Sequence, residues 1–214
     1  MIYILPVLTA SDYNELIRIA SPGPLMDSTS VSVISLTKVH ELSPALSVWV
    51  AQLQQVRGRL LDVVKAMDKD ILDFTPDERK IETIGTLCLH IAAVEWSWIF
   101  EDIYGKEMNF EEWKYAFPLR SSVNVPQLRG KEKMFYIDVL DKVRKEVMQK
   151  IIKWTDADLA RRVGMTRASE IEAQYTIEWI LFHIIEHETL HIGQINLLRR
   201  LAKCSAMTSV SSQS

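Results

Sequence analysis

From residue 43 onward, hydrophobic residues recur at intervals of three and four, which is the repeat of an amphipathic helix. The first such run follows Ser43 and Pro44, a pair typical of a helix N-cap and the first helical position. The segment DKDILDFTPDERK then closes the run with turn-forming residues. The sequence therefore predicts a first long helix, with its apolar positions at Leu46, Trp49, Leu53, Val56, Leu60, Val63 and Met67.

The same repeat predicts three further long helices. Thr83 is the expected cap of the second helix, and Gly105 is expected to end it. The third helix occupies residues 131–154, and the fourth follows Thr176, another candidate cap. The inward positions of the second and third helices are Ile84, Leu87, Ile91, Val94, Trp98, Ile137, Leu140, Val147, Ile151 and Trp154.

Residues 105–130 form a long connection between the second and third helices. They carry Pro118, Pro126 and Gly130, and at most one short helix from Asn109 to Ala116. A connection of this length can cross a bundle and leave the two flanking helices parallel. With no convincing strand run between residues 43 and 203, the predicted fold is all-α, a four-helix bundle with this long crossover.

The two ends of the chain have a different character from the bundle region. Residues 1–42 contain an apolar run at 3–8 and the Ser-rich stretch STSVSVISLT, and we interpret them as an extension of unknown role packed loosely on the main body. Residues 204–214 are small and polar, and we expect a disordered tail. The predicted division is thus 1–42, 43–203 and 204–214.

Composition and charge exclude several classes of protein. Hydrophobic residues make up 48% of the 214 residues, enough for a real core. A net charge of −3, with both signs interspersed, gives no basis for binding nucleic acid or an anionic membrane. The two cysteines, Cys88 and Cys204, favour a reducing compartment, and the cytoplasm is the default because no export signal or membrane span is visible.

The motif HETLH carries the candidate chemistry. His187 and His191 lie four residues apart, so on a helix their side chains are about 40° apart, close enough to bind one metal ion. Both fall in the apolar stripe that includes Ile180, Ile184 and Leu198, and they are therefore expected to point inward. An inward pair needs partners, which are either a shared metal ion or separate hydrogen bonds in the core.

A third ligand must come from upstream. HETLH matches the H-E-x-x-H zincin pattern, but Gln194 and Leu197 occupy the positions where the extended metzincin motif has Gly and His. After Glu188 the chain contains no acidic residue and no further histidine except His191. His90, in the predicted second helix, is the best candidate, because it leans toward the inward face.

The remaining histidines and nearby polar residues each have two interpretations. His183 lies in the same stripe, but one straight helix cannot easily bring it onto the ion of the pair, so a core or pocket-wall role is favoured over a ligand role. Glu186 and Glu188 lie about 100° to either side of His187, and we interpret them as solvated flanks or as groups that orient a ring. Gln194 faces the pocket or packs as a core amide, and Glu95 lines a pocket mouth or belongs to the core. His40 lies outside the helical pattern, and Cys88 is interpreted as a buried thiol.

Three segments together carry a family resemblance: LCLHIAAVEWSWIF, WTDADLARRV and HIIEHETLHIGQINLLRR. Over residues 43–203 the sequence resembles the DinB-like superfamily of metal-binding four-helix bundles, which includes thiol S-transferases and metal-dependent hydrolases. The resemblance implies an up-down-down-up bundle and places the metal triad on His90, His187 and His191. Ile192 departs from the family pattern, since relatives often have His or Arg there, and the first 40 residues are unmatched. These departures leave the substrate open.

The resemblance implies a metal-dependent enzyme with two alternative chemistries. In one, a low-molecular-weight thiol binds the metal as thiolate and attacks an electrophilic small molecule; in the other, metal-bound water hydrolyses an amide or ester. One divalent ion is expected, Zn or Ni first and Fe or Mn as alternatives. A homodimer is compatible with the family, and a non-catalytic metal-binding bundle related to stress is the alternative from another class.

Overall fold

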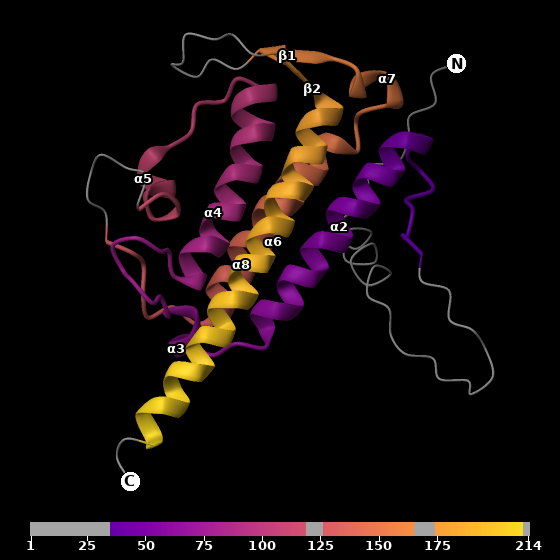
Figure 1. The fold of residues 1–214 in the computed structure, drawn as a ribbon. Helices are drawn as coiled ribbons and strands as arrows, with labels where there is room; N and C mark the ends of the chain where they lie inside the picture. Colours follow the sequence, from indigo (N-terminus) through magenta and orange to yellow (C-terminus); the bar gives the residue numbers. More distant parts are fainter. Residues whose placement is uncertain (1–34, 119–125, 165–173, 212–214) are drawn as a thin grey trace, which may run out of the picture.

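Four long helices lie side by side in the computed structural model, which describes residues 35–118, 126–164 and 174–211 (Figure 1). They are α2 (Pro44–Lys65), α4 (Ile84–Trp96), α6 (Lys133–Ile151) and α8 (Ile177–Ser211). α4 packs against both α6 and α8, and α2 packs against α8 and α6. The predicted predominance of helix is confirmed. Most of the predicted N-terminal extension, residues 1–34, lies outside the described residues.

Short elements fill the connections between the long helices. They are α3 (Lys69–Leu72), α5 (Phe110–Trp113), the 3-10 turn η2 (Lys114–Ala116) and α7 (Asp156–Leu159). α5 and η2 match the short helix predicted in the long connection. The expectation of no strand was wrong: β1 (Arg162–Gly164) pairs antiparallel with β2 (Gln174–Thr176). Three residues per strand are too few to show an alternation of apolar and polar positions.

The helix starts show which predicted caps operate. Thr83 Oγ1 accepts from Thr86 N at 3.1 Å, and Thr176 Oγ1 accepts from Trp179 N at 3.2 Å, so both predicted caps are confirmed. Ser43 does not cap α2. Its hydroxyl instead donates to Asp156 Oδ1 at 2.6 Å, and the same carboxylate accepts from Leu46 N at 2.9 Å. A distant carboxylate on α7 therefore does the capping, and these hydrogen bonds hold the pKa of Asp156 below its ordinary value.

α4 is the central helix, with nearly every side chain buried. After Trp96 it continues as a wider π-helix, η1 (Ser97–Ile103), and the chain turns at Gly105 with φ +66°. The predicted end at Gly105 is confirmed, because this left-handed backbone suits glycine. The change to π geometry was not predicted, since an apolar repeat of three and four does not report it.

The long connection returns the chain to the end of the bundle where α4 begins. Gln127 Oε1 accepts from Thr83 N at 2.6 Å, next to the start of α4. Lys133 Nζ at the start of α6 donates to Lys65 O, at the end of α2, at 3.0 Å. The starts of α4 and α6 therefore lie at the end of the bundle where α2 ends.

α8 is longer than expected. It continues to Ser211, so residues 204–211, predicted as a disordered tail, are helical instead. Figure 1 shows this yellow end projecting past α3. Composition misled here because small polar residues only weakly disfavour continuation of a helix that is already formed. Within the described part of the chain, no helix has the length and apolar character needed to cross a membrane.

Candidate metal centre

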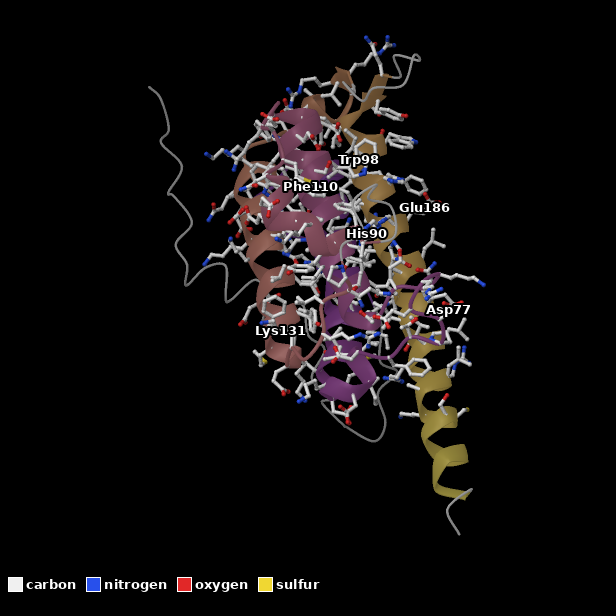
Figure 2. All side chains as sticks on the ribbon, turned by 90° about the vertical axis from the view of Figure 1, so that its left-hand side faces the viewer. Asp77, His90, Trp98, Phe110, Lys131 and Glu186 are labelled. Atoms are coloured by element: carbon white, nitrogen blue, oxygen red, sulfur yellow. The ribbon has the colours of Figure 1, made fainter. Side chains whose placement is uncertain are left out.

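Three imidazole rings from two helices converge in the bundle. His90 comes from α4, and His187 and His191 come from α8. His187 Nε2 lies 3.2 Å from His90 Nε2 and 3.0 Å from His191 Nε2. One ligand atom from each ring lies within 4.8 Å of the other two. The structure thus brings together the three histidines that the sequence singled out; Figure 2 shows His90 against α8.

Hydrogen bonds at the opposite nitrogens fix two of these rings. His90 Nδ1 lies 3.2 Å from Ala116 O, and His191 Nδ1 lies 2.7 Å from Gln194 Oε1. Because a carbonyl oxygen can only accept, Nδ1 must carry the proton in each ring. Each Nε2 then presents a lone pair toward His187. This is the arrangement in which metal-binding histidines are commonly held, with the second nitrogen donating to an oxygen.

The donor set fits a divalent cation. Nitrogen ligands at 2.0–2.1 Å around a tetrahedral zinc ion lie about 3.3 Å apart, close to the observed 3.0 and 3.2 Å. Among the described residues, no fourth His, Cys, Asp or Glu joins the cluster. His90 is buried, whereas His187 and His191 are half-buried, so the cluster has one side toward solvent. Three protein ligands with an open side are typical of catalytic metal sites.

The other histidines and Gln194 lie outside this cluster. The His183 ring is centred 6.1 Å from that of His187 and stacks on Trp179 instead. Gln194 is exposed, and its Oε1 lies 2.7 Å from His191 Nδ1. His40 is exposed before α2. One residue that sequence reasoning did not single out also matters: Phe117 packs edge-on against His90, with ring centroids 5.1 Å apart.

Glu188 was wrongly interpreted as a solvated flank. Only 1% of it is exposed, and it lies among charged partners inside the bundle. Arg57 Nε donates to Glu188 Oε1 at 2.8 Å, and Arg144 Nη2 donates to Glu188 Oε2 at 2.9 Å. Its neighbour Glu186 is exposed, as expected. The helical repeat places the two glutamates on different faces of the helix, but it does not indicate which of these faces is turned toward Arg57 on α2 and Arg144 on α6.

Glu95 completes a buried ionic quartet, which we define as Arg57, Glu95, Arg144 and Glu188. Arg57 Nη2 donates to Glu95 Oε2 at 2.6 Å, and Arg144 Nε donates to Glu95 Oε1. Each arginine also donates to a backbone carbonyl, that of Leu140 or Leu53. Glu95 therefore sits in the core rather than at a pocket mouth. One residue from each long helix contributes, so the quartet joins all four helices.

The quartet is electrically balanced, with two positive and two negative groups. Burial by itself would raise the pKa of Glu95, but Arg144 and Arg57 outweigh burial and hold that pKa below 4.5. Burial would lower the pKa of Arg57, but Glu188 and Glu95 outweigh it and raise the pKa. Glu95 and Arg57 are therefore charged at neutral pH. The signal in the sequence was an arginine within each apolar stripe: Arg57 lies between Leu53 and Leu60, and Arg144 between Leu140 and Val147.

The two cysteines lie in different environments, and the burial predicted for Cys88 is confirmed. Cys88 is fully buried in the core, and Cys204 is exposed on α8. Burial raises the pKa of the Cys88 thiol to about 12. Cys88 is therefore protonated at neutral pH and is not a reactive nucleophile.

Comparisons with known proteins agree with this architecture. The sequence model of the DinB family matches residues 42–205. Two solved structures are similar in fold: a conserved protein from Enterococcus faecalis (15% identity, TM-score 0.53) and a DinB-like protein from Bacillus cereus (17% identity, TM-score 0.50). Each alignment covers 72% of this chain, with 95% of the first structure and 91% of the second. No curated protein matches the sequence.

Proposed function

Since this chain belongs to the DinB family, we propose that it is a metal-dependent enzyme whose His90, His187 and His191 hold one divalent ion. The convergence of three Nε2 atoms, two of them with their Nδ1 protons anchored on oxygens, carries this proposal. Zinc or nickel is the first expectation, because imidazole suits both. The solvent side of the cluster favours an enzyme over a structural metal bundle.

The up-down-down-up direction of the four long helices belongs to the same proposal. The positions of Thr83, Gln127, Lys65 and Lys133 support it, because they bring the starts of α4 and α6 to the end of the bundle where α2 ends. The long connection between α4 and α6 would then cross the bundle and leave these two helices parallel, as the sequence suggested.

We further propose that the reaction is transfer of a low-molecular-weight thiol to an electrophilic small molecule. A divalent ion with three neutral ligands keeps its charge, which lowers the pKa of a coordinated thiol or water and supplies a nucleophile. Hydrolysis by the H-E-x-x-H pattern needs the glutamate as a general base. Here Arg57 and Arg144 hold both oxygens of Glu188 inside the core. Thiol transfer needs no such base, and the position of Glu188 therefore favours it.

Metal content tests the first part of the proposal. After purified protein has been dialysed against buffer, we expect inductively coupled plasma mass spectrometry to find about one divalent ion per chain. His187→Ala is expected to lose the ion, while His183→Ala, altered one turn away on the same helix, is expected to keep it. Full retention of metal by His187→Ala would contradict the site assignment.

Substrate trials test the second part. Bacillithiol-, mycothiol- and glutathione-type thiols are each supplied with a chlorinated aromatic acceptor, and adduct formation is followed by chromatography. We expect an adduct with at least one thiol in the wild type and none in His187→Ala. Ester turnover without any dependence on thiol would instead support the hydrolase.

A further inference from the structure

Aromatic rings recur at every fourth position from β2 into α8. They belong to Tyr175, Trp179, His183, His187 and His191, and we call the first three the ring ladder. The Tyr175 and Trp179 rings are centred 4.3 Å apart, and the Trp179 and His183 rings are stacked 5.0 Å apart with planes only 4° from parallel. The ladder leads directly to the metal centre, because the His183 ring lies 6.1 Å from that of His187.

Trp98 supports the ring ladder from inside the molecule. Its ring contacts all three ladder rings, at centroid distances of 5.7 Å from Tyr175, 5.7 Å from Trp179 and 5.1 Å from His183. Trp98 comes from η1 and is only 5% exposed. Figure 2 shows it beside α8, nearer the start of that helix than His90 is. The ladder rings are therefore held in place on their inner side.

The outer side of the ring ladder is accessible. Trp179 is 38% exposed, and the side chain of His183 is 29% exposed. His187 and His191, which follow at the same four-residue spacing, are half-buried. A small molecule that approaches the solvent side of the metal centre therefore finds flat aromatic surface beside it, already fixed by packing.

We propose that the ring ladder binds the planar, electron-poor aromatic part of the acceptor substrate next to the metal centre. Indole and imidazole faces are rich in electron density, and they attract flat rings whose own faces are electron-poor. A rigid platform also loses little conformational freedom on binding. This inference rests on the proposed function for the reaction, but the binding step requires only the three ladder rings, not the metal.

Binding of 1,3-dinitrobenzene tests the inference, because this electron-poor ring carries no leaving group and stays unreacted. Titrations followed by ligand NMR compare the wild type with Trp179→Ala, Trp179→Phe and Leu190→Ala. Leu190 is 65% exposed on the same helix, between His187 and His191 in the sequence, and it controls for general apolar adhesion. We expect Trp179→Ala to weaken binding roughly threefold to tenfold, with Trp179→Phe and Leu190→Ala close to the wild type.

Three results would overturn the inference: no saturable binding by the wild type, unchanged binding by Trp179→Ala, or an equal loss in Leu190→Ala. The same titration on His187→Ala separates the two proposals. Dinitrobenzene binding that persists in that variant supports the ladder even if thiol transfer is never observed. Cyclohexanol, a non-planar ring of similar size, is expected to bind more weakly than dinitrobenzene; equal binding would also contradict recognition by stacking.

Discussion

Replacing Glu188 with alanine tests the role assigned to the buried quartet. The change removes the acceptor for Arg57 Nε at 2.8 Å, Arg57 Nη2 at 3.1 Å and Arg144 Nη2 at 2.9 Å. Two buried guanidinium groups would then share one carboxylate, that of Glu95. Breaking a buried ion pair on one side costs about 3–5 kcal/mol, a large share of the roughly 5–15 kcal/mol that stabilises a typical domain.

Urea unfolding followed by far-ultraviolet circular dichroism measures the effect. We expect Glu188→Ala to lose about 3–5 kcal/mol of unfolding free energy, and Glu188→Gln, which keeps one acceptor oxygen, to lose about 1–3 kcal/mol. Glu186→Ala is the matched control, because that glutamate is exposed two residues away. Its expected change is within about 0.5 kcal/mol.

A loss in Glu188→Ala no larger than that in Glu186→Ala would refute the reasoning. The quartet would then contribute little to stability, and the glutamate of the H-E-x-x-H pattern would again be available for a catalytic role. If Glu188 were a general base, Glu188→Ala would keep the full free energy of unfolding but lose activity.

Three further predictions concern the packing at two glycines, the burial of Cys88 and the charge of Glu95. A Cβ added at Gly85 would overlap the ring end of buried Tyr136, so Gly85→Ala should lower the free energy of unfolding by about 1–3 kcal/mol in the same urea assay. Gly58 on α2 faces open space, so Gly58→Ala should raise the free energy of unfolding by about 0.4–1 kcal/mol. Thiol titration with a chromogenic disulfide at pH 8 should detect Cys204 alone in the native protein and Cys88 as well after unfolding, and rapid reaction of both would contradict the burial of Cys88. Arg144 and Arg57 hold the folded-state pKa of Glu95 below its ordinary value of 4.5, so the stability that its charge provides is present above about pH 4.5 and is lost as pH falls through the folded-state pKa. The melting temperature should therefore fall as the pH is lowered through this range, and it should fall less steeply in Glu95→Gln.

The long helices and the pair His187 and His191 could be predicted because they depend on short-range regularities. Caps at Thr83 and Thr176 act within three residues of their own position, and they were found in the structure. The pair His187 and His191 follows from one turn of helix. His90 needed a choice among few alternatives, since the chain contains only five histidines.

The remaining features depend on contacts between distant residues, which periodicity does not contain. Asp156 caps α2 from 110 positions away, so Ser43 was credited with a cap that it does not make. Glu188 and Glu186 lie about 100° to either side of His187, and only the packing of α2 against α8, with Arg144 reaching in from α6, decides which of them is buried. The sequence contained one indication of a buried acidic partner, namely an arginine, Arg57 or Arg144, within the apolar stripe of each of two helices.

The quartet also has a consequence for the order in which the molecule is assembled during synthesis. Arg57 and Glu188 are separated by 131 positions, and Glu188 lies on α8, which is synthesised after the other three long helices. Until that helix docks, the first three helices hold two arginines against one glutamate, with an excess positive charge at the place where their core would close. Docking of α8 neutralises this charge and brings His187 and His191 to His90 in the same step. Docking of α8 would therefore complete the buried quartet and the three-histidine cluster together.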